Sequence, residues 1–474
     1  MDIQNFSALF NTPARREAFL KLIKDNKTKH IFIQGLEGSS IALFFSNLLE
    51  HKQAHILIAN DLDEAGYLYN DLVQINGNDH ILLFPSGYKR DIKYGQPDPP
   101  SEILRTEVLN RLCQKGESLL IVTYPEAIAE KVVPVNMLSE QTLHIDKNSK
   151  CDIITLSDKL RERGFEEVDY VYEPGQFAVR GSILDVFSYT NELPYRIDFF
   201  GKEVESIRTF EVETQLSTGK LEEVYIVANV CGQEASGISI LDFIDKNTIL
   251  ICHNLSWVID RISTIASESL SEQTLIAEEG DRYAMQKIID VTAFQKKITT
   301  FRRIDYGANS EANTPAVIRF NCAPQGVYHK NFDLVSQSFS QFIEKGYTLY
   351  ILSDSEKQIE RLQAIFEERG DSISFTPVLK TLHEGFIDND LKIGCFTDHQ
   401  IFDRFHKYTL KSEHARSGKL ALSLKELNQI EVGDYIVHVD HGIGRFGGLI
   451  HTEINGKMQE VIKLTYQNDD IIFV

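Results

Sequence analysis

Three features of exported and membrane proteins are missing from this sequence. Its six cysteines are scattered and form no CxxC pair, which speaks against a zinc knuckle and fits a reduced chain. No run approaches the roughly 20 apolar residues that a membrane span needs. The first residues, Met1 to Asn5, have neither the basic region nor the apolar core of a signal peptide. The sequence therefore predicts a cytoplasmic protein.

The chain is also poor in positive charge. Its 49 lysines and arginines face 69 acidic residues, which gives a net charge of −20 over 474 residues. Because phosphate binding needs a basic surface, this balance argues against a chain that wraps DNA alone, although it is compatible with a local basic patch. Solubility is the simpler interpretation of the charge. The length favours about three domains.

Short apolar runs separated by helical patterns fill residues 1–134. Four of these runs do not alternate with polar residues, as expected of strands that are covered on both faces. They are residues 30–33, 55–58, 80–84 and 119–122. Apolar residues recur at helical spacing over 61–75. Strands alternating with helices predict a parallel sheet, and the buried run 248–252 predicts that this domain resumes over 213–326.

An antiparallel pattern interrupts that domain. Residues 135–212 are rich in β-branched and aromatic side chains, and Gly201-Lys202 can close a two-residue hairpin. Ser157 is expected to cap a short helix that ends near Gly164. We therefore expect a small inserted domain at 135–212.

Two further units follow. Residues 327–410 predict a small separate α/β domain, and residues 411–426 an exposed linker. Residues 427–474 contain four strand patterns, with Asn455-Gly456 as a hairpin signal, and predict a small β-barrel-like module. Because the sequence stops at Val474 within an apolar strand, we expect a longer parent protein.

A glycine-rich turn follows the first predicted strand and leads into an apolar helix. This is the context of a phosphate-binding loop, which needs a lysine for the phosphates and a serine or threonine for Mg²⁺. Isoleucine and alanine occupy those two places, and Glu37 would repel phosphate. We expect no catalytic residue and no cofactor here, and a glycine turn before any helix predicts the same inactivity. The turn comprises Gly35, Gly38, Ser39, Ser40, Ile41 and Ala42.

Two parts of the chain carry a family resemblance. EPGQFAVRGSILDVF at 173–187, with YRIDFFGKEVESIR at 195–208, resembles the module with which UvrB and the transcription-repair-coupling factor recruit UvrA. VGDYIVHVDHGIGRF at 432–446, with LTY at 464–466, resembles the polymerase-interaction module of the coupling factor, which is also found in CarD-like regulators. UvrB lacks the second module. The pair therefore resembles the N-terminal portion of the bacterial transcription-repair-coupling factor.

The resemblance implies a multidomain α/β fold. Its parts are a degenerate P-loop (helicase-like) parallel sheet, an inserted small α+β UvrA-binding domain, a second small α/β domain and a C-terminal CarD-like β-barrel module. The implied function is that of an adaptor in transcription-coupled nucleotide excision repair. It recruits UvrA to RNA polymerase stalled at DNA lesions and binds the polymerase β subunit. ATP, Mg²⁺ and most DNA contacts would belong to translocase motor domains outside this chain.

The resemblance also implies the contact residues. Arg180, Arg196 and Phe200 would bind UvrA, and period-two alternation places Arg196, Asp198 and Phe200 on one strand face. On spacing alone, a salt bridge from Arg196 to Asp198 or Asp185 with a core Phe200 is the simpler interpretation. The strand around Arg445 to Glu453 would pair with the polymerase. The implied polymerase-binding residues are Arg445, Phe446, Leu449, Ile450 and Thr452.

Other functions are compatible with parts of the pattern. One is a UvrB-like module that binds damaged DNA, but the loop at 85–101 is too short and too rich in proline for the DNA-inserting hairpin of UvrB. Another is an ATPase fragment, against which Ile41 and Ala42 argue. A metal at His438, Asp440 and His441 is not expected, because no further ligand lies nearby in the sequence.

Overall fold

The computed structural model describes most of the chain and divides it into two units, Met1–Ser412 and Glu413–Val474. The described residues are 1–25, 27–87, 99–114, 116–147, 149, 151–189, 191, 193–212, 214–228, 237–273, 288–308, 316–406, 408, 432–438, 442–454, 457–466 and 471–473.

A seven-stranded sheet forms the centre of the first unit, and all its neighbouring strands are parallel. The four strands expected before residue 134 and the one expected at 248–252 are all present in it. In spatial order the strands are β15 (Ala316–Arg319), β1 (His30–Gln34), β14 (Arg302–Gly307), β13 (Ile249–Cys252), β2 (Ala54–Ile58), β4 (Leu119–Thr123) and β3 (Ile81–Phe84).

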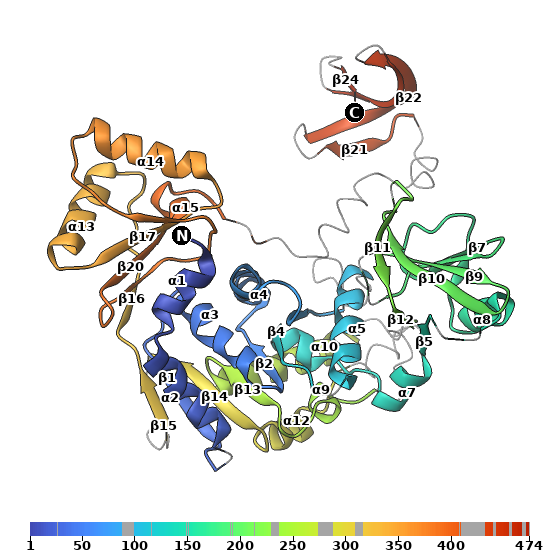
Figure 1. Ribbon diagram of the computed structural model, residues 1–474, viewed down its shortest axis with the longest axis horizontal. Coiled ribbons are helices and arrows are strands. Elements are labelled where there is room, and N and C mark those ends of the chain that lie inside the picture. Colours follow the sequence, from blue (N-terminus) through green and yellow to red (C-terminus); the bar gives the residue numbers. More distant parts are fainter. Residues whose placement is uncertain are drawn as a thin grey trace. The chain divides into compact units, whose positions relative to one another are not determined.

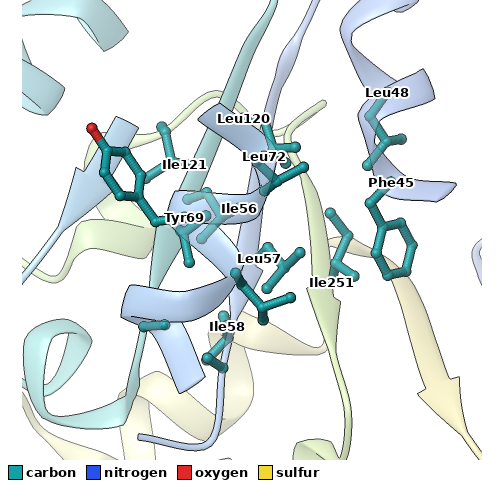
Figure 2. Close-up of a cluster of buried hydrophobic side chains, with 14 of the residues drawn as sticks. Phe45, Leu48, Ile56, Leu57, Ile58, Tyr69, Leu72, Leu120, Ile121 and Ile251 are labelled. Carbon is teal, nitrogen blue, oxygen red and sulfur yellow. The ribbon is translucent and has the colours of Figure 1, made fainter. Parts of the chain in front are cut away.

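Helices connect these strands and bury the apolar sheet. Tyr69 and Leu72 of α4 lie against Ile56 and Leu57 of β2 (Figure 2). The side chain of Asp61 caps α4 by accepting the Glu64 amide, as the helical pattern at 61–75 predicts. The helices are α1 (Ile3–Phe10), α2 (Pro13–Lys24), α3 (Ser40–Phe45), the 3₁₀ helix η1 (Ser46–Glu50), α4 (Leu62–Asn76), α5 (Pro99–Cys113), α6 (Pro125–Ala129), α9 (Ile240–Phe243), α10 (Leu255–Gln273) and α12 (Val291–Ile298).

A second, five-stranded sheet has the order β16-β19-β20-β17-β18, and helices α13 and α14 lie beside it (Figure 1). One set of its side chains forms its own cluster with these helices, around Phe339 and Phe396. Another set, including Phe386, joins the core of the seven-stranded sheet. The elements are β16 (Cys322–Pro324), α13 (Phe332–Glu344), β17 (Thr348–Leu352), α14 (Glu356–Glu368), β18 (Thr376–Val378), β19 (Phe386–Asp388), β20 (Ile393–Thr397) and α15 (Asp398–Ile401).

The inserted region contains a six-stranded sheet of order β11-β10-β9-β8-β7-β6. Its strand pairs are antiparallel except β6 with β7, and the Gly201-Lys202 hairpin joins β9 to β10 as expected. The elements are α8 (Ile153–Glu162), β6 (Glu166–Glu167), β7 (Gln176–Arg180), β8 (Ile183–Val186), β9 (Tyr195–Phe200), β10 (Glu203–Phe210) and β11 (Ser217–Leu221).

The predicted start of the helix in this region is wrong. Asp152, not Ser157, is the N-cap of α8, and its carboxylate accepts the Ile154 amide. Ser157 lies inside the helix, where its hydroxyl donates to the carbonyl oxygen of Ile153 at 2.7 Å. A serine can hydrogen-bond to either place, so its presence alone does not fix a helix start.

A two-stranded ribbon accompanies the inserted sheet. α7 (Val135–Glu140) leads into β5 (Thr142–Asp146), which pairs with β12 (Glu223–Val227). Val224 and Ile226 of β12 share the apolar cluster of the inserted sheet. The insert thus continues to β12, whereas the sequence placed its end at residue 212.

The second unit is a four-stranded antiparallel sheet of order β21-β22-β23-β24. Its strands are β21 (Tyr435–His438), β22 (Gly442–Ile454), β23 (Lys457–Thr465) and β24 (Ile471–Phe473). The predicted linker at 411–426 and the Asn455-Gly456 turn lie outside the described residues. Among the helices that the structure describes, none is long and apolar enough to cross a membrane.

Candidate functional site

The glycine-rich turn lies between β1 and α3, at the carboxyl end of the parallel sheet, where such sheets bind ligands. Gly35 and Gly38 have φ values of +81° and +53°. A Cβ atom on Gly35 would lie 2.2 Å from the backbone oxygen of Phe320, and one on Gly38 would lie 2.8 Å from that of Gly385. These glycines therefore permit a close approach of the chain's own backbone.

Most backbone amides of the turn already have an acceptor within the protein. A phosphate loop binds its ligand through free N–H groups, so each engaged amide is one fewer for a phosphate. The amide of Gly35 donates to Gly307 O (3.1 Å), that of Glu37 to Ser40 Oγ (2.9 Å), that of Ser39 to Glu384 O (3.1 Å), that of Ser40 to Glu37 O (3.2 Å) and that of Ile41 to Gly38 O (3.2 Å).

The buried carboxyl group of Asp71 on α4 hydrogen-bonds both to the glycine-rich turn and to the segment between β18 and β19. Asp71 accepts the Ser39 hydroxyl at 2.5 Å and the His383 amide at 2.8 Å. Ser39 Oγ in turn accepts the Glu384 amide at 2.9 Å. Burial raises the pKa of Asp71 to about 7, against the opposing effect of its two hydrogen bonds. Sequence reasoning missed this contact, since Asp71 and His383 stand 312 positions apart.

An acidic cleft of about 530 Å³ opens beside the turn. Six carboxylates line it together with His253 and His383, and the ring of His383 stacks on Tyr67 at 3.5 Å between centroids. Such a lining repels an anionic phosphate chain. The acidic residues are Glu37, Asp61, Asp63, Glu64, Asp71 and Glu384.

Ile41 and Ala42 occupy the positions at which a working phosphate loop carries its lysine and its Mg²⁺ ligand. Ile41 is half-buried at the rim of the cleft, and Ala42 is fully buried in the core. Neither side chain can donate to a phosphate or coordinate a cation. The predicted loop at 85–101 is partly outside the described residues, and Pro99 already begins α5.

The three residues expected to bind UvrA lie on one sheet of the insert, but in different environments. Asp185, fully buried on β8, forms ion pairs with both Arg180 and Arg196. The side chain of Arg196 is 13% exposed and also donates to Gln215 O at 3.0 Å, whereas that of Arg180 is 35% exposed. Phe200 is 79% exposed at the end of β9.

The predicted alternation along β9 is confirmed. Tyr195, Ile197 and Phe199 are buried, whereas Arg196 and Phe200 face the other side. The simpler interpretation is therefore half right. The Arg196–Asp185 ion pair exists at 2.7 Å, but Phe200 is not a core residue.

The expected polymerase-binding strand is β22. β21 pairs with it only from Gly442 to Arg445, whereas β23 pairs with it as far as Ile454. The second half of β22 therefore has one edge without a partner strand among the described strands. Phe446 is buried, and Arg445 lies over the Tyr435 ring at 5.2 Å. Leu449, Ile450 and Thr452 pair with Ile462, Val461 and Gln459, and their side chains lie outside the described residues.

Metal ligation has no cluster to support it in the part of the chain that the structure describes, where no group of three His, Cys, Asp or Glu side chains could hold an ion. His438 ends β21, and Asp440 and His441 lie outside the described residues.

Comparison with known proteins matches the two modules separately. Residues 143–230 match the family model described as the UvrB interaction domain, and residues 430–474 match the CarD-like/TRCF RID domain. The chain resembles the transcription-repair-coupling factors. It is 24% identical over 517 residues to the Transcription-repair-coupling factor of Staphylococcus aureus (strain MRSA252), covering 93% of this chain and 44% of that protein. The coupling factor of Staphylococcus epidermidis (strain ATCC 35984) is 22% identical over 523 residues, covering 94% and 44%.

These matches confirm the resemblance that the two sequence segments indicated. The chain spans less than half the length of the coupling factors that it matches. Its similarity to them extends over nearly all of its own length, including the regions between the two modules.

Proposed function

We propose that this chain is the adaptor portion of a transcription-repair-coupling factor. It recruits UvrA to RNA polymerase stalled at DNA lesions and binds the polymerase β subunit, within the cytoplasm. One observation carries the proposal, namely that a UvrB interaction domain and a CarD-like/TRCF RID domain occur in the same chain. Either module alone would be compatible with a different class of protein.

Phe200 and Arg180 are the proposed contacts with UvrA. An aromatic ring that is 79% exposed on a strand, on the same sheet as an arginine that is 35% exposed, has the composition of an interaction hot spot. Arg196 supports this surface from underneath the exposed side chains, because its guanidinium is mostly buried between Asp185 and Gln215.

The edge of β22 that no described strand pairs with, beyond Arg445, is the proposed contact with the polymerase. An exposed strand edge can add a strand from a partner through main-chain hydrogen bonds, and the neighbouring side chains then give specificity. The expected residues Leu449, Ile450 and Thr452 stand along this half of β22, and Arg445 precedes it. The proposed architecture of this unit is a CarD-like barrel.

The seven-stranded sheet is the proposed remnant of a P-loop, helicase-like domain that binds no nucleotide. The engaged amides, the acidic cleft and the identities of Ile41 and Ala42 support this. ATP hydrolysis would then belong to a motor outside this chain. An ATPase fragment and a UvrB-like damage-binding fragment are the competing functions. DNA-stimulated ATP turnover by this chain would establish the first, and salt-sensitive DNA binding by residues 1–330 would establish the second.

Binding of the 474-residue chain to immobilised UvrA and, separately, to the polymerase β subunit tests the proposal. Phe200→Ala should weaken UvrA binding by about 2 kcal/mol, or roughly 30-fold, without affecting the β subunit. Leu216→Ala, which alters another exposed apolar residue of the insert, is the matched control and should leave both affinities unchanged. Leu449→Arg should weaken only the β-subunit complex. Failure of the unaltered chain to bind either protein would refute the adaptor function.

A further inference from the structure

A row of charged side chains crosses the outer face of the inserted sheet. Asp185 lies at its centre with no exposed surface, and both Arg180 and Arg196 donate to its carboxylate. A second pair, Asp198 with Arg208, continues the row across β9 and β10. A buried carboxylate that two arginines share fixes the positions of both.

The ring of Tyr170 also contacts Arg180. The guanidinium carbon of Arg180 lies 4.9 Å from the centroid of the Tyr170 ring, and this tyrosine is itself 48% exposed. Tyr170 comes from the segment between β6 and β7, so it reaches the sheet from outside the strand ladder. Arg180 is thus stacked on a ring and bonded through Nη2 to Asp185, while its other N–H groups donate to no described residue.

Arg180 and Phe200 are near enough to meet one partner. Arg180 pairs with Ile183, and Ile183 pairs with Asp198, two residues before Phe200. Two strand spacings and two residues of rise place the two Cα atoms roughly 12 Å apart. This separation lies well within a single protein interface.

We propose that Tyr170 and Asp185 are positioning residues, which hold Arg180 in place to bind a carboxylate on the protein partner. Beside that carboxylate, the partner would have an apolar pocket that receives Phe200. The inference rests on the proposed recruitment of UvrA and adds how the surface is organised. A free arginine loses side-chain entropy when a partner immobilises it, and a guanidinium already fixed between a ring and a carboxylate loses less.

Arg196 is a further positioning residue of this group, although the family resemblance implied that it contacts UvrA. Its guanidinium carbon lies 4.3 Å from the centroid of the Phe210 ring, and its N–H groups donate to Asp185 and to Gln215. Gln215 has a φ of +57°, so this hydrogen bond also holds a turn in a backbone conformation that non-glycine residues seldom adopt. Arg196 therefore acts on the partner through Asp185 rather than by touching it.

A double-mutant cycle with the full 474-residue chain and purified UvrA tests the role of Tyr170. Arg180→Ala should weaken binding roughly 30-fold, and Tyr170→Ala about three- to five-fold. Tyr170→Phe keeps the ring and should bind within about two-fold of the unaltered chain. The double variant Y170A/R180A should bind no more weakly than R180A, because Tyr170 acts only through Arg180.

Tyr172→Ala is the matched control. Tyr172 belongs to the same segment and is 58% exposed, but its ring stacks on no arginine in the described part of the chain. Its loss should not change the affinity. An equal loss for Y172A and Y170A would assign the effect to apolar area and overturn the inference, as would additive losses in Y170A/R180A.

The proposed function fails in a distinguishable way. If R180A and F200A both bind UvrA like the unaltered chain, the surface itself is wrongly assigned and the positioning falls with it. If they weaken binding and Y170A does not, only the positioning is wrong. Asp185→Asn adds a second readout, and Asp198→Asn is its control. If Asp185 positions Arg180, D185N should bind UvrA more weakly than D198N, and its affinity should depend less on salt concentration. The comparison requires that the two variants have the same melting temperature.

Discussion

The buried carboxyl group of Asp71 links two distant segments of the fold, and its pKa makes part of the stability depend on pH. It lies on α4, in the core of the first unit, and connects the glycine-rich turn to the segment at His383. Burial raises its pKa to about 7 from an ordinary value of 3.8. The folded chain therefore binds this proton more tightly than the unfolded chain does.

The consequence is that the contribution of Asp71 to the stability of the fold decreases with rising pH. The contribution of the protonated Asp71 is complete below about pH 4 and is lost as the pH rises towards 7. Asp71→Asn cannot titrate. The stability of the unaltered chain relative to D71N should therefore fall between pH 4 and 7 by up to about 1.4 kcal/mol per pH unit. Urea unfolding of both proteins across this range measures the difference, and a difference that stays constant would contradict the account.

Single residues differ in how well the sequence reveals them. The alternation along β9 predicted which face carries Arg196 and Phe200, because strand geometry is local. The same spacing named Asp185 as a possible partner of Arg196, which the 2.7 Å ion pair confirms. Nothing local marks Tyr170 or Asp71, since each acts through a contact that only the folded chain forms.

The glycine-rich turn keeps the outline of a phosphate loop between β1 and α3, but its hydrogen bonds run inside the protein. The Glu384 carbonyl accepts the Ser39 amide, and the Glu384 amide donates to Ser39 Oγ. From Ile41 and Ala42, the sequence predicted that the lysine and the Mg²⁺ ligand of a phosphate loop are lost. It could not predict that a segment about 345 positions away would engage the turn.

Restoring the two lost residues should therefore not restore nucleotide binding. The double variant I41K/A42S supplies a lysine and a hydroxyl, but the amides remain engaged and the cleft remains acidic. Titration with a fluorescent ATP analogue and Mg²⁺ should give no saturable signal up to about 1 mM, where binding would be worth about 4 kcal/mol. Circular dichroism checks that the variant is folded. Saturable, Mg²⁺-dependent binding would show that the two substitutions alone had removed the site.

Elements with strong local signals were easier to predict than their ends and their neighbours. The buried strands at 30–33 and 55–58 appear as β1 and β2 because continuous apolar runs need cover on both faces. The start of α8 was misplaced, since Asp152 and Ser157 are both residue types that favour helix caps. The edge of β22 that has no partner among the described strands begins where β21 stops, which no sequence period encodes.

The first unit is more continuous than its sequence pattern indicates. The region at 327–410 was predicted as a separate domain, yet Phe6 of α1 packs on Tyr350 and Phe10 packs on Phe386, with ring centroids 5.2 and 5.3 Å apart. The amino group of Met1 also donates to Pro377 O at 3.0 Å. The N-terminal helices thus join the two sheets, and long-range contacts of this kind leave no trace in local periodicity.

Arg15 allows this connection to be measured. It lies at the start of α2 and pairs at 2.6 Å with Asp388 of β19, whose side chain has no exposed surface. Arg15→Ala leaves that carboxylate buried without its counter-ion. Among the described residues, the amides of Asp390 and Leu391 are then the donors that remain to it. The substitution should lower the free energy of unfolding by roughly 2–4 kcal/mol, somewhat below the usual loss for a broken buried pair.

Arg16→Ala provides the comparison, because Arg16 pairs with Glu50 where both side chains are about half exposed. Its effect should stay within about 0.5 kcal/mol. If the N-terminal helices make one cooperative unit of the two sheets, R15A should lower the midpoint of a single unfolding transition. A separate early transition in R15A would mean that the five-stranded sheet unfolds on its own. Adding Asp388→Asn to R15A should recover part of the loss, because no buried charge then remains unpaired.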